Sequence, residues 1–148
     1  MKTLLYNIDI QAPVSKVFDT MLNRDTYKQW TSEFNPTSDF KGGWNKGDKI
    51  YFTSTNETGK CEGMIAQIAE HIPNEYISIR HYGILDNDIE ITEGPAVAGW
   101  AGALENYTFK ENGGITTVDI AVDTNDEYVA YFDKTWPKAL KRLKEICE

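Results

Sequence analysis

The chain opens with an alternation of apolar and polar side chains. In the segment LLYNIDI, the apolar residues that share one face fall at every second position, at Leu4, Tyr6, Ile8 and Ile10. A period of two is typical of a β-strand with one buried face. Ala12-Pro13 interrupts the alternation, so we predict a half-buried strand over residues 4–10.

Two helical segments follow this strand. In PVSKVFDTML, apolar residues recur at helical spacing, at Val14, Val17, Phe18 and Met21. Pro13 suits the start of this helix, because the first backbone N–H groups of a helix have no partner within it. Asn23 is a suitable N-cap for a second short helix over RDTYKQWTSEF, which would present Tyr27, Trp30 and Phe34.

From Pro36 onward, clusters of glycine, proline and asparagine separate short alternating runs of hairpin-strand length. The predicted strands are DKIYFTS (48–54), CEGMIAQIAEH (61–71), EYISIRHYG (75–83), ALENYTF (103–109) and TTVDIAVD (116–123). Close turns pair neighbouring strands antiparallel. One connection differs, because residues 84–99 are long, acidic and interrupted by Gly94-Pro95. We expect this connection to be a flap without secondary structure.

The last segment, residues 125–148, has the pattern of an amphipathic helix. Its apolar stripe comprises Phe132, Trp136, Ala139 or Leu140, Leu143, and Ile146 or Cys147. Asn125 is a suitable N-cap, and Pro137 should kink the helix or divide it in two. Strands segregated from helices predict an α+β domain, with a curved antiparallel sheet packed on one long C-terminal helix.

Composition and charge narrow the class of protein. The 148 residues are 41% hydrophobic and 26% charged, which suits one globular domain over residues 1–148. The formal net charge of −8 disfavours binding to nucleic acid or to an anionic membrane, since like charges repel.

No segment of the chain predicts export or membrane insertion. The apolar run near the start is too short for a secretion signal or a membrane span. Cys61 and Cys147 lack CxxC spacing and are expected to be reduced and structural. We therefore expect a cytoplasmic protein.

The motifs of common cofactor and metal sites are missing from the sequence. It contains no GxSxG, Walker loop, GxGxxG or HExxH, and its acidic stretches do not follow the calcium-loop pattern. His71 and His81 lack the spacing of metal ligands. We expect His71 in a turn, Trp44 in a loop over a sheet edge, and no cofactor or metal.

Several strings, taken in order, resemble one family. They are IDIQAPVSKVFDTM, YKQWT, GWNKGDKIYF, GMIAQIAEHIPNEYISIRH, WAGALENYTF and WPKALKRLKE. Together they resemble the SRPBCC (START-like, birch-pollen-allergen-like) helix-grip superfamily, in the branch homologous to the heat-shock ATPase activator. The resemblance spans nearly the whole chain and implies the helix-grip fold. It leaves function open, because the superfamily covers lipid carriers, hormone receptors, cyclase domains and co-chaperones.

The resemblance also implies an apolar cavity between the sheet and the C-terminal helix. By position, the inward rows would be Ile50, Phe52 and Ser54; Ile77, Ile79 and His81; Glu105, Tyr107 and Phe109; and Val118, Ile120 and Val122. The candidate ligand-binding residues are Trp30, Phe34, Phe52, Ile79, His81, Trp100, Glu105, Tyr107, Tyr128, Phe132 and Trp136. The alternative is that the aromatic residues form an ordinary packed core.

Glu105 is the unusual residue of its predicted strand. The period of two places it on the same face as Tyr107 and Phe109. A register that pairs Ile77 with Phe109 would also pair His81 with Glu105. Such a pair could anchor a polar head group, act as an acid–base couple, or satisfy two polar side chains.

Three functions follow from these observations. We expect the protein to bind a small hydrophobic or amphipathic molecule without covalent chemistry. The first alternative is a co-chaperone-like module that contacts a protein partner through its exposed surface. The second alternative is a cyclase-like or hydrolase-like enzyme that uses His81 and Glu105.

Overall fold

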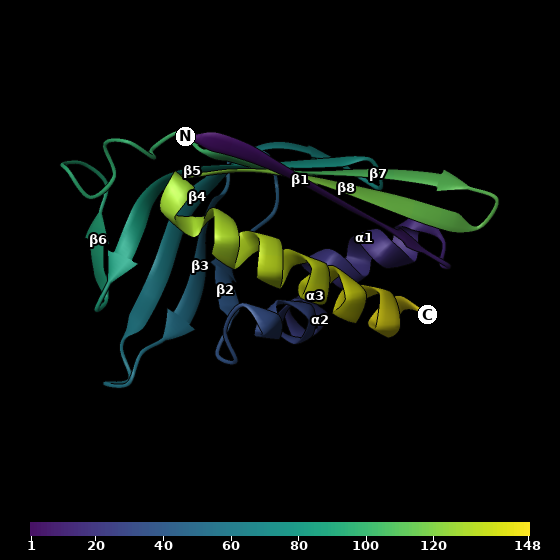
Figure 1. The fold of residues 1–148 in the computed structure, drawn as a ribbon, viewed down its shortest axis with the longest axis horizontal. Helices are drawn as coiled ribbons and strands as arrows, with labels where there is room; N and C mark the ends of the chain where they lie inside the picture. The colour runs from purple at the N-terminus through teal and green to yellow at the C-terminus, as the bar shows by residue number, and fades with distance from the viewer.

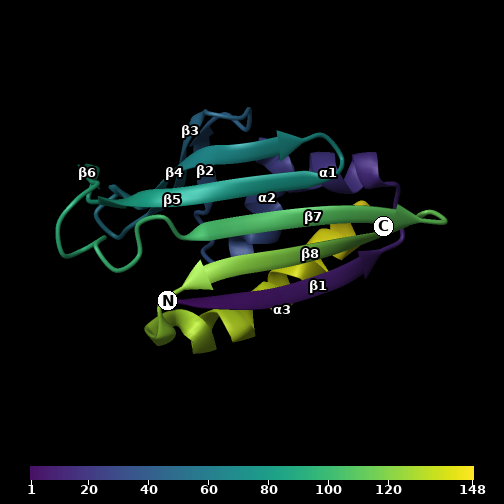
Figure 2. The same cartoon turned by 90° about the horizontal axis from the view of Figure 1, so that it is seen from above.

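A computed structural model of residues 1–148 contains a curved antiparallel sheet that wraps around a long helix (Figures 1 and 2). The strands follow the order β1-β8-β7-β5-β4-β3-β2, and β6 pairs with β5. Their bounds are β1 Lys2–Ile10, β2 Asp39–Gly42, β3 Lys49–Thr55, β4 Cys61–Ile72, β5 Tyr76–Asp86, β6 Ile89–Ile91, β7 Leu104–Asn112 and β8 Ile115–Thr124. Every pairing is antiparallel, as the close turns predicted.

Three helices lie on the concave face of this sheet. They are α1 (Val14–Leu22), α2 (Arg24–Trp30) and α3 (Val129–Cys147), with short 3₁₀ turns η1 (Thr31–Glu33) and η2 (Asp126–Tyr128). In Figure 1 α3 runs along the concavity, while α1 and α2 lie beside its second half. The predicted α+β class and the helix-grip arrangement are confirmed.

The hydrophobic core lies between the sheet and the helices. Buried side chains from α1, α2, α3 and the inward faces of the strands form one continuous cluster. The helical pattern left two choices open in α3: Ala139 and Leu140 are both buried, and Cys147 is buried while Ile146 is partly buried. In β1 the alternation holds, because Ile10 is buried while Leu5, on the other face, is 76% exposed.

The turn between α1 and α2 is stabilised as the sequence predicted. The Asn23 side chain accepts a hydrogen bond of 3.0 Å from the backbone N–H of Asp25. This bond satisfies one of the N–H groups that the start of a helix leaves without a partner. It orients α2 so that Tyr27 and Trp30 are buried against the core.

The expectation of an unstructured flap over residues 84–99 is wrong for its first part. Strand β5 continues to Asp86 and returns as β6 through a two-residue turn. Asn87 and Asp88 form this turn with positive φ angles of 50° and 68°, a conformation that these two residue types tolerate. Residues 92–103 then lead to β7 without a further strand.

The C-terminal helix is not divided at Pro137, and Asn125 does not cap it. Helix α3 is continuous through Pro137, so the proline does not divide it. The missing proline N–H costs about 3 kcal/mol in a helix interior, and burial of Trp136 and Leu140 on both sides of it offsets that cost. The side chain of Asn125 makes no capping bond, because the 3₁₀ turn η2 precedes α3.

Two further elements were missed or misplaced. The short strand β2 pairs with β3, but its sequence is too brief to show a period. His71 lies in β4 and not in a turn, and its Nδ1 is 2.7 Å from the carbonyl oxygen of Trp44. Trp44 lies in the loop between β2 and β3 and packs against the core.

Candidate functional site

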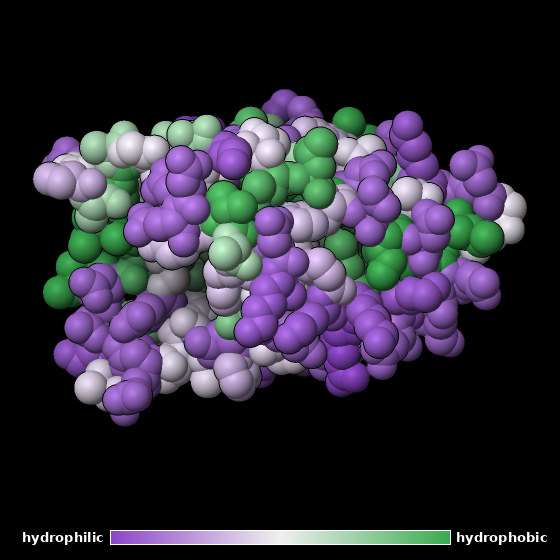
Figure 3. All heavy atoms as spheres, in the orientation of Figure 1, coloured by the Kyte–Doolittle hydropathy of each residue, from purple (hydrophilic) through white to green (hydrophobic).

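A cavity of about 500 Å³ lies between the concave face of the sheet and the first half of α3. Strands β3, β4, β5, β7 and β8 supply one wall, and α2, α3 and residues 92–103 supply the others. In Figure 3 the surface is hollowed between β6 and the first turns of α3, with apolar residues beside the hollow. This volume is in the range of small-molecule sites in proteins.

Ten of the eleven candidate ligand-binding residues line this cavity: Trp30, Phe34, Phe52, His81, Trp100, Glu105, Tyr107, Tyr128, Phe132 and Trp136. The structure thus brings together residues from helices, strands and the 92–103 segment. Ile79 is the exception, because it is fully buried in the core and is not part of the lining. Tyr128 lies at the entrance, where it is 49% exposed.

The sequence reasoning missed several residues of the lining. They include Tyr27, Ser38, Met64, Ile84, Ala96, Asp123, Glu127 and Tyr131. Tyr27 could have been found, because it lies three residues before Trp30 and therefore on the same face of α2. Asp123 and Glu127 carry no such signal, since their position depends on how β8 leads into α3.

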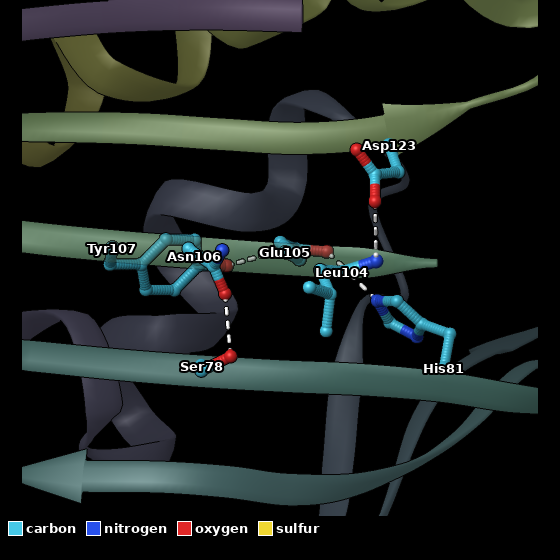
Figure 4. A network of polar contacts seen from close by, with 7 residues as sticks. All are labelled: Ser78, His81, Leu104, Glu105, Asn106, Tyr107 and Asp123. Atoms are coloured by element: carbon cyan, nitrogen blue, oxygen red, sulfur yellow. Dashed lines mark hydrogen bonds and ion pairs between the residues drawn. The ribbon is translucent and has the colours of Figure 1, made fainter. Parts of the chain in front are cut away.

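Glu105 is at the centre of a hydrogen-bonded network inside the cavity (Figure 4). His81 Nε2 lies 3.2 Å from Glu105 Oε1, and the Tyr107 hydroxyl donates to Glu105 Oε2. The side chains of His81 and Glu105 are 4% and 15% exposed. Because an ionised carboxylate only accepts hydrogen bonds, the hydrogen of the first contact belongs to His81 Nε2.

The predicted register between β5 and β7 is wrong by two residues. Ile77 pairs with Tyr107, and Ile79 pairs with Glu105. A shift of two keeps every side chain on its predicted face, whereas a shift of one would have reversed the faces. His81 therefore reaches Glu105 diagonally, from beyond the last pair of the ladder.

Residues 92–103 cover one side of the cavity and are attached to β5 at His81. The rings of Trp100 and His81 stack with centroids 5.6 Å apart and an interplanar angle of 27°. The N–H of His81 donates to the Ala103 carbonyl at 2.9 Å, and the N–H of Gly102 donates to the His81 carbonyl at 2.7 Å. His81 thus holds this segment by its backbone and contacts Trp100 by its ring.

The pKa values of two tyrosine hydroxyls near Glu105, those of Tyr107 and Tyr27, are strongly raised. Burial raises the pKa of Tyr107 well above its ordinary value of 10.0, and the nearby Glu105 carboxylate raises it further. Burial followed by the Glu105 charge likewise raises the pKa of Tyr27. Both hydroxyls are therefore neutral hydrogen-bond donors at neutral pH.

Two polar atoms of the lining are buried and have no partner within the protein. They are Nδ1 of His81 and Nε1 of Trp136. A buried polar atom without a partner costs about 1–3 kcal/mol of stability. Such atoms are consistent with a site in which a bound molecule supplies the missing partner.

Other features of the molecule point less clearly to a site. A second depression of about 540 Å³ lies near Pro73 and Lys110, and only two of its eight lining residues are hydrophobic. No cluster of three His, Cys, Asp or Glu residues is arranged to hold a metal ion. None of the helices has the length and apolar character needed to span a bilayer.

The sequence matches a protein-family model over residues 11–148, and that model describes the "Activator of Hsp90 ATPase homolog 1-like protein". A search of curated proteins found no match.

Solved structures of similar fold come from several bacteria. Aha1 from Colwellia psychrerythraea, solved as a dimer in solution, is 20% identical with a TM-score of 0.71, and the match covers 100% of this chain and 97% of that one. A protein from Nitrosomonas europaea is 14% identical with a TM-score of 0.72, over 98% and 93% of the two chains. CalU16 from Micromonospora echinospora is 15% identical with a TM-score of 0.67, over 99% and 76%. At these identities the likeness shows a shared fold.

Proposed function

The chain belongs to the family of Activator of Hsp90 ATPase homolog 1-like proteins, and from this premise we propose that it binds a small hydrophobic or amphipathic molecule. The bound molecule would occupy the cavity between the sheet and α3, without forming a covalent bond to the protein. The observation that carries the proposal is a cavity of about 500 Å³ among apolar and aromatic side chains. Its polar groups converge on Glu105.

The chemistry of the cavity supports an amphipathic ligand over a purely apolar one. Aromatic and aliphatic side chains would surround the apolar body. Glu105, His81 and Tyr107 would meet a polar group of the ligand. A purely apolar ligand would leave the polar atoms of His81 and Trp136 without partners, which costs free energy.

A fluorescent probe tests whether the cavity accepts a ligand. N-phenyl-1-naphthylamine is neutral and becomes strongly fluorescent in apolar surroundings. We expect the wild-type protein to increase its fluorescence, and Ser54→Phe to abolish that increase, because Ser54 lines the cavity. Ser15→Phe is the matched control, since Ser15 is exposed on α1 and distant from the lining.

The same experiment can contradict the proposal. Equal fluorescence from Ser54→Phe and the wild type would place the probe outside the cavity. No fluorescence increase, together with no co-purified small molecule in native mass spectrometry, would mean that the cavity does not bind ligands of this kind.

The family description favours a second candidate function, a co-chaperone-like module that contacts a heat-shock ATPase. This function would use the exposed surface and would not depend on the cavity. We expect Ser54→Phe, if this function is correct, to stimulate the ATPase as well as the wild type does. Unchanged ATPase activity in the presence of the wild-type protein would exclude it.

The enzyme hypothesis stays the third candidate. The His81–Glu105 pair would be its acid–base couple. The double variant His81→Ala/Glu105→Ala should then lose all turnover of a processed ligand, and full turnover by that variant would exclude the hypothesis.

A further inference from the structure

We infer that the ligand of this cavity carries a positive charge and is a protonated amine joined to an apolar or aromatic body. This inference rests on the proposed function and specifies the chemical class of the molecule bound. It follows from the charges, the unused hydrogen-bond acceptors and the aromatic rings of the lining.

The charged side chains of the lining are nearly all acidic. Glu105, Asp123 and Glu127 contribute carboxylates, and no lysine or arginine lines the cavity. The chain has 15 lysine and arginine residues, so their absence from the lining is a property of the cavity and not of the composition. An anionic head group would lose its hydration here without gaining an opposite charge.

The carboxylate of Glu105 is only 15% exposed and can accept further hydrogen bonds. Each of its oxygen atoms receives one hydrogen bond, from His81 and from Tyr107. A carboxylate oxygen can accept two hydrogen bonds, so each oxygen can take a further donor. The low exposure of Glu105 strengthens its attraction for a cation, because screening by water is reduced.

His81 offers a second acceptor beside this carboxylate. Its Nε2 carries the hydrogen that contacts Glu105, and in a neutral imidazole the other nitrogen is then an acceptor. That nitrogen, Nδ1, is buried without a partner. An ammonium group has several N–H donors and no acceptor, which complements both Glu105 and His81. Trp136 Nε1 is a donor without a partner and suits an oxygen atom on the same ligand.

Aromatic rings provide the remaining surface for a cation and its apolar body. They include Trp30, Phe34, Trp100, Tyr107, Phe132 and Trp136. The face of an aromatic ring attracts a cation, and this attraction is stronger where water is excluded. The same rings bury an apolar body, so one lining suits both parts of an aromatic or alkyl amine.

A series of three probes with the same tail tests the charge of the ligand. Octylammonium, octanol and octanoate differ in their head groups, which are cationic, neutral and anionic. We expect isothermal titration calorimetry to show that octylammonium binds about tenfold more tightly than octanol and that octanoate binds most weakly. The difference would come from the attraction of the ammonium group to the lining, which is only partly exposed to water.

Glu105→Gln removes the charge and keeps the shape of the side chain. This variant should lower the octylammonium affinity about tenfold and that of octanol by a smaller factor, because only the ammonium loses an opposite charge. Retained octanol binding shows that the cavity of the variant is intact. Glu57→Gln is the matched control, because it removes the same charge from an exposed residue outside the lining, and it should change none of the three affinities.

Each remaining outcome overturns the inference. If octanol or octanoate binds as tightly as octylammonium, the ligand class is wrong while the proposed function stands. If octylammonium binds best but equally well to Glu105→Gln, the buried carboxylate does not select the ligand. If none of the three probes binds and N-phenyl-1-naphthylamine also fails, the inference and the proposed function fall together.

Discussion

His81 and Glu105 are hydrogen-bonded although they are not partners in the β5–β7 ladder. Glu105 lies opposite Ile79, and His81 Nε2 reaches its Oε1 across a diagonal at 3.2 Å. The bond therefore depends on the His81 side chain leaning back along the sheet, where the Trp100 ring stacks against it. A small displacement of the 92–103 segment would alter the polar end of the cavity.

Removal of the Glu105 carboxylate should destabilise the fold. Glu105→Ala leaves the buried Nε2–H of His81 and the Tyr107 hydroxyl without their acceptor. We expect a loss of about 1–3 kcal/mol in the free energy of unfolding, measured by urea denaturation. Tyr107→Phe removes one donor and leaves the carboxylate bound to His81, so it should cost about 1 kcal/mol. A larger loss from Tyr107→Phe than from Glu105→Ala would contradict this assignment of the network.

Gly63 in β4 should not tolerate a side chain. Its φ angle is +148°, and a Cβ atom there would overlap the carbonyl oxygen of Phe52 on β3. We expect Gly63→Ala to lower the free energy of unfolding by about 2 kcal/mol or more, since the backbone must shift. Gly99→Ala is the control, because Gly99 has open space around it and no positive φ. Equal melting temperatures for the two variants would show that β3 adjusts freely.

Tyrosines whose pKa values are raised in the folded state should make the protein less stable at high pH. The pKa values of Tyr6, Tyr27, Tyr107 and Tyr131 are raised above 10.0, with burial as the largest cause for each. The folded state then holds a proton that the unfolded state releases above pH 10.0, so stability falls as the pH rises past that value. Phenolate absorbance should show these four of the eight tyrosines titrating later than the other four.

Tyr107→Phe provides the check for this alkaline transition. In this variant, one tyrosine fewer should titrate at high pH, and the tyrosines that titrate at lower pH should be unchanged. Phenolate formation by all eight tyrosines before the circular dichroism signal changes would contradict the prediction.

The ion pair between Arg24 on α2 and Asp39 on β2 should contribute less to the stability of the fold at acidic pH than at neutral pH. Arg24 donates two hydrogen bonds to Asp39, of 3.0 and 2.8 Å, and lowers the pKa of that carboxyl below 3.8. A lowered pKa contributes stability above pH 3.8 that is lost as the pH falls through the folded value. Arg24→Gln should therefore lower the melting temperature by about 2 °C at neutral pH and less at pH below 3.8. Arg142→Gln removes the same charge without breaking an ion pair, and an equal effect of both variants at neutral pH would rule out a contribution from the pair.

The faces of the strands and the class of the fold could be predicted from the sequence. Side-chain period is a local property, so alternation alone placed Glu105 on the inner face with Tyr107. That placement holds even though the predicted register was wrong by two residues, because such a shift preserves the face. The helical stripe of α3 was equally readable, since a period near 3.6 needs no knowledge of distant residues.

Only the tertiary structure decided which residues meet and whether space remains between them. Of the two effects predicted for Pro137, a kink or a division of α3, the division does not occur, and buried residues flank the proline on both sides. The sequence pattern cannot distinguish an inward residue that lines a cavity from one that fills the core. Ile79 faces inward as predicted, but it is buried in the core and does not line the cavity. Asp123 and Glu127 line the same cavity as Glu105 because of the way in which the chain passes from β8 into α3. Period and composition determine which side chains face inward, whereas the volume left among them depends on how all the elements pack together.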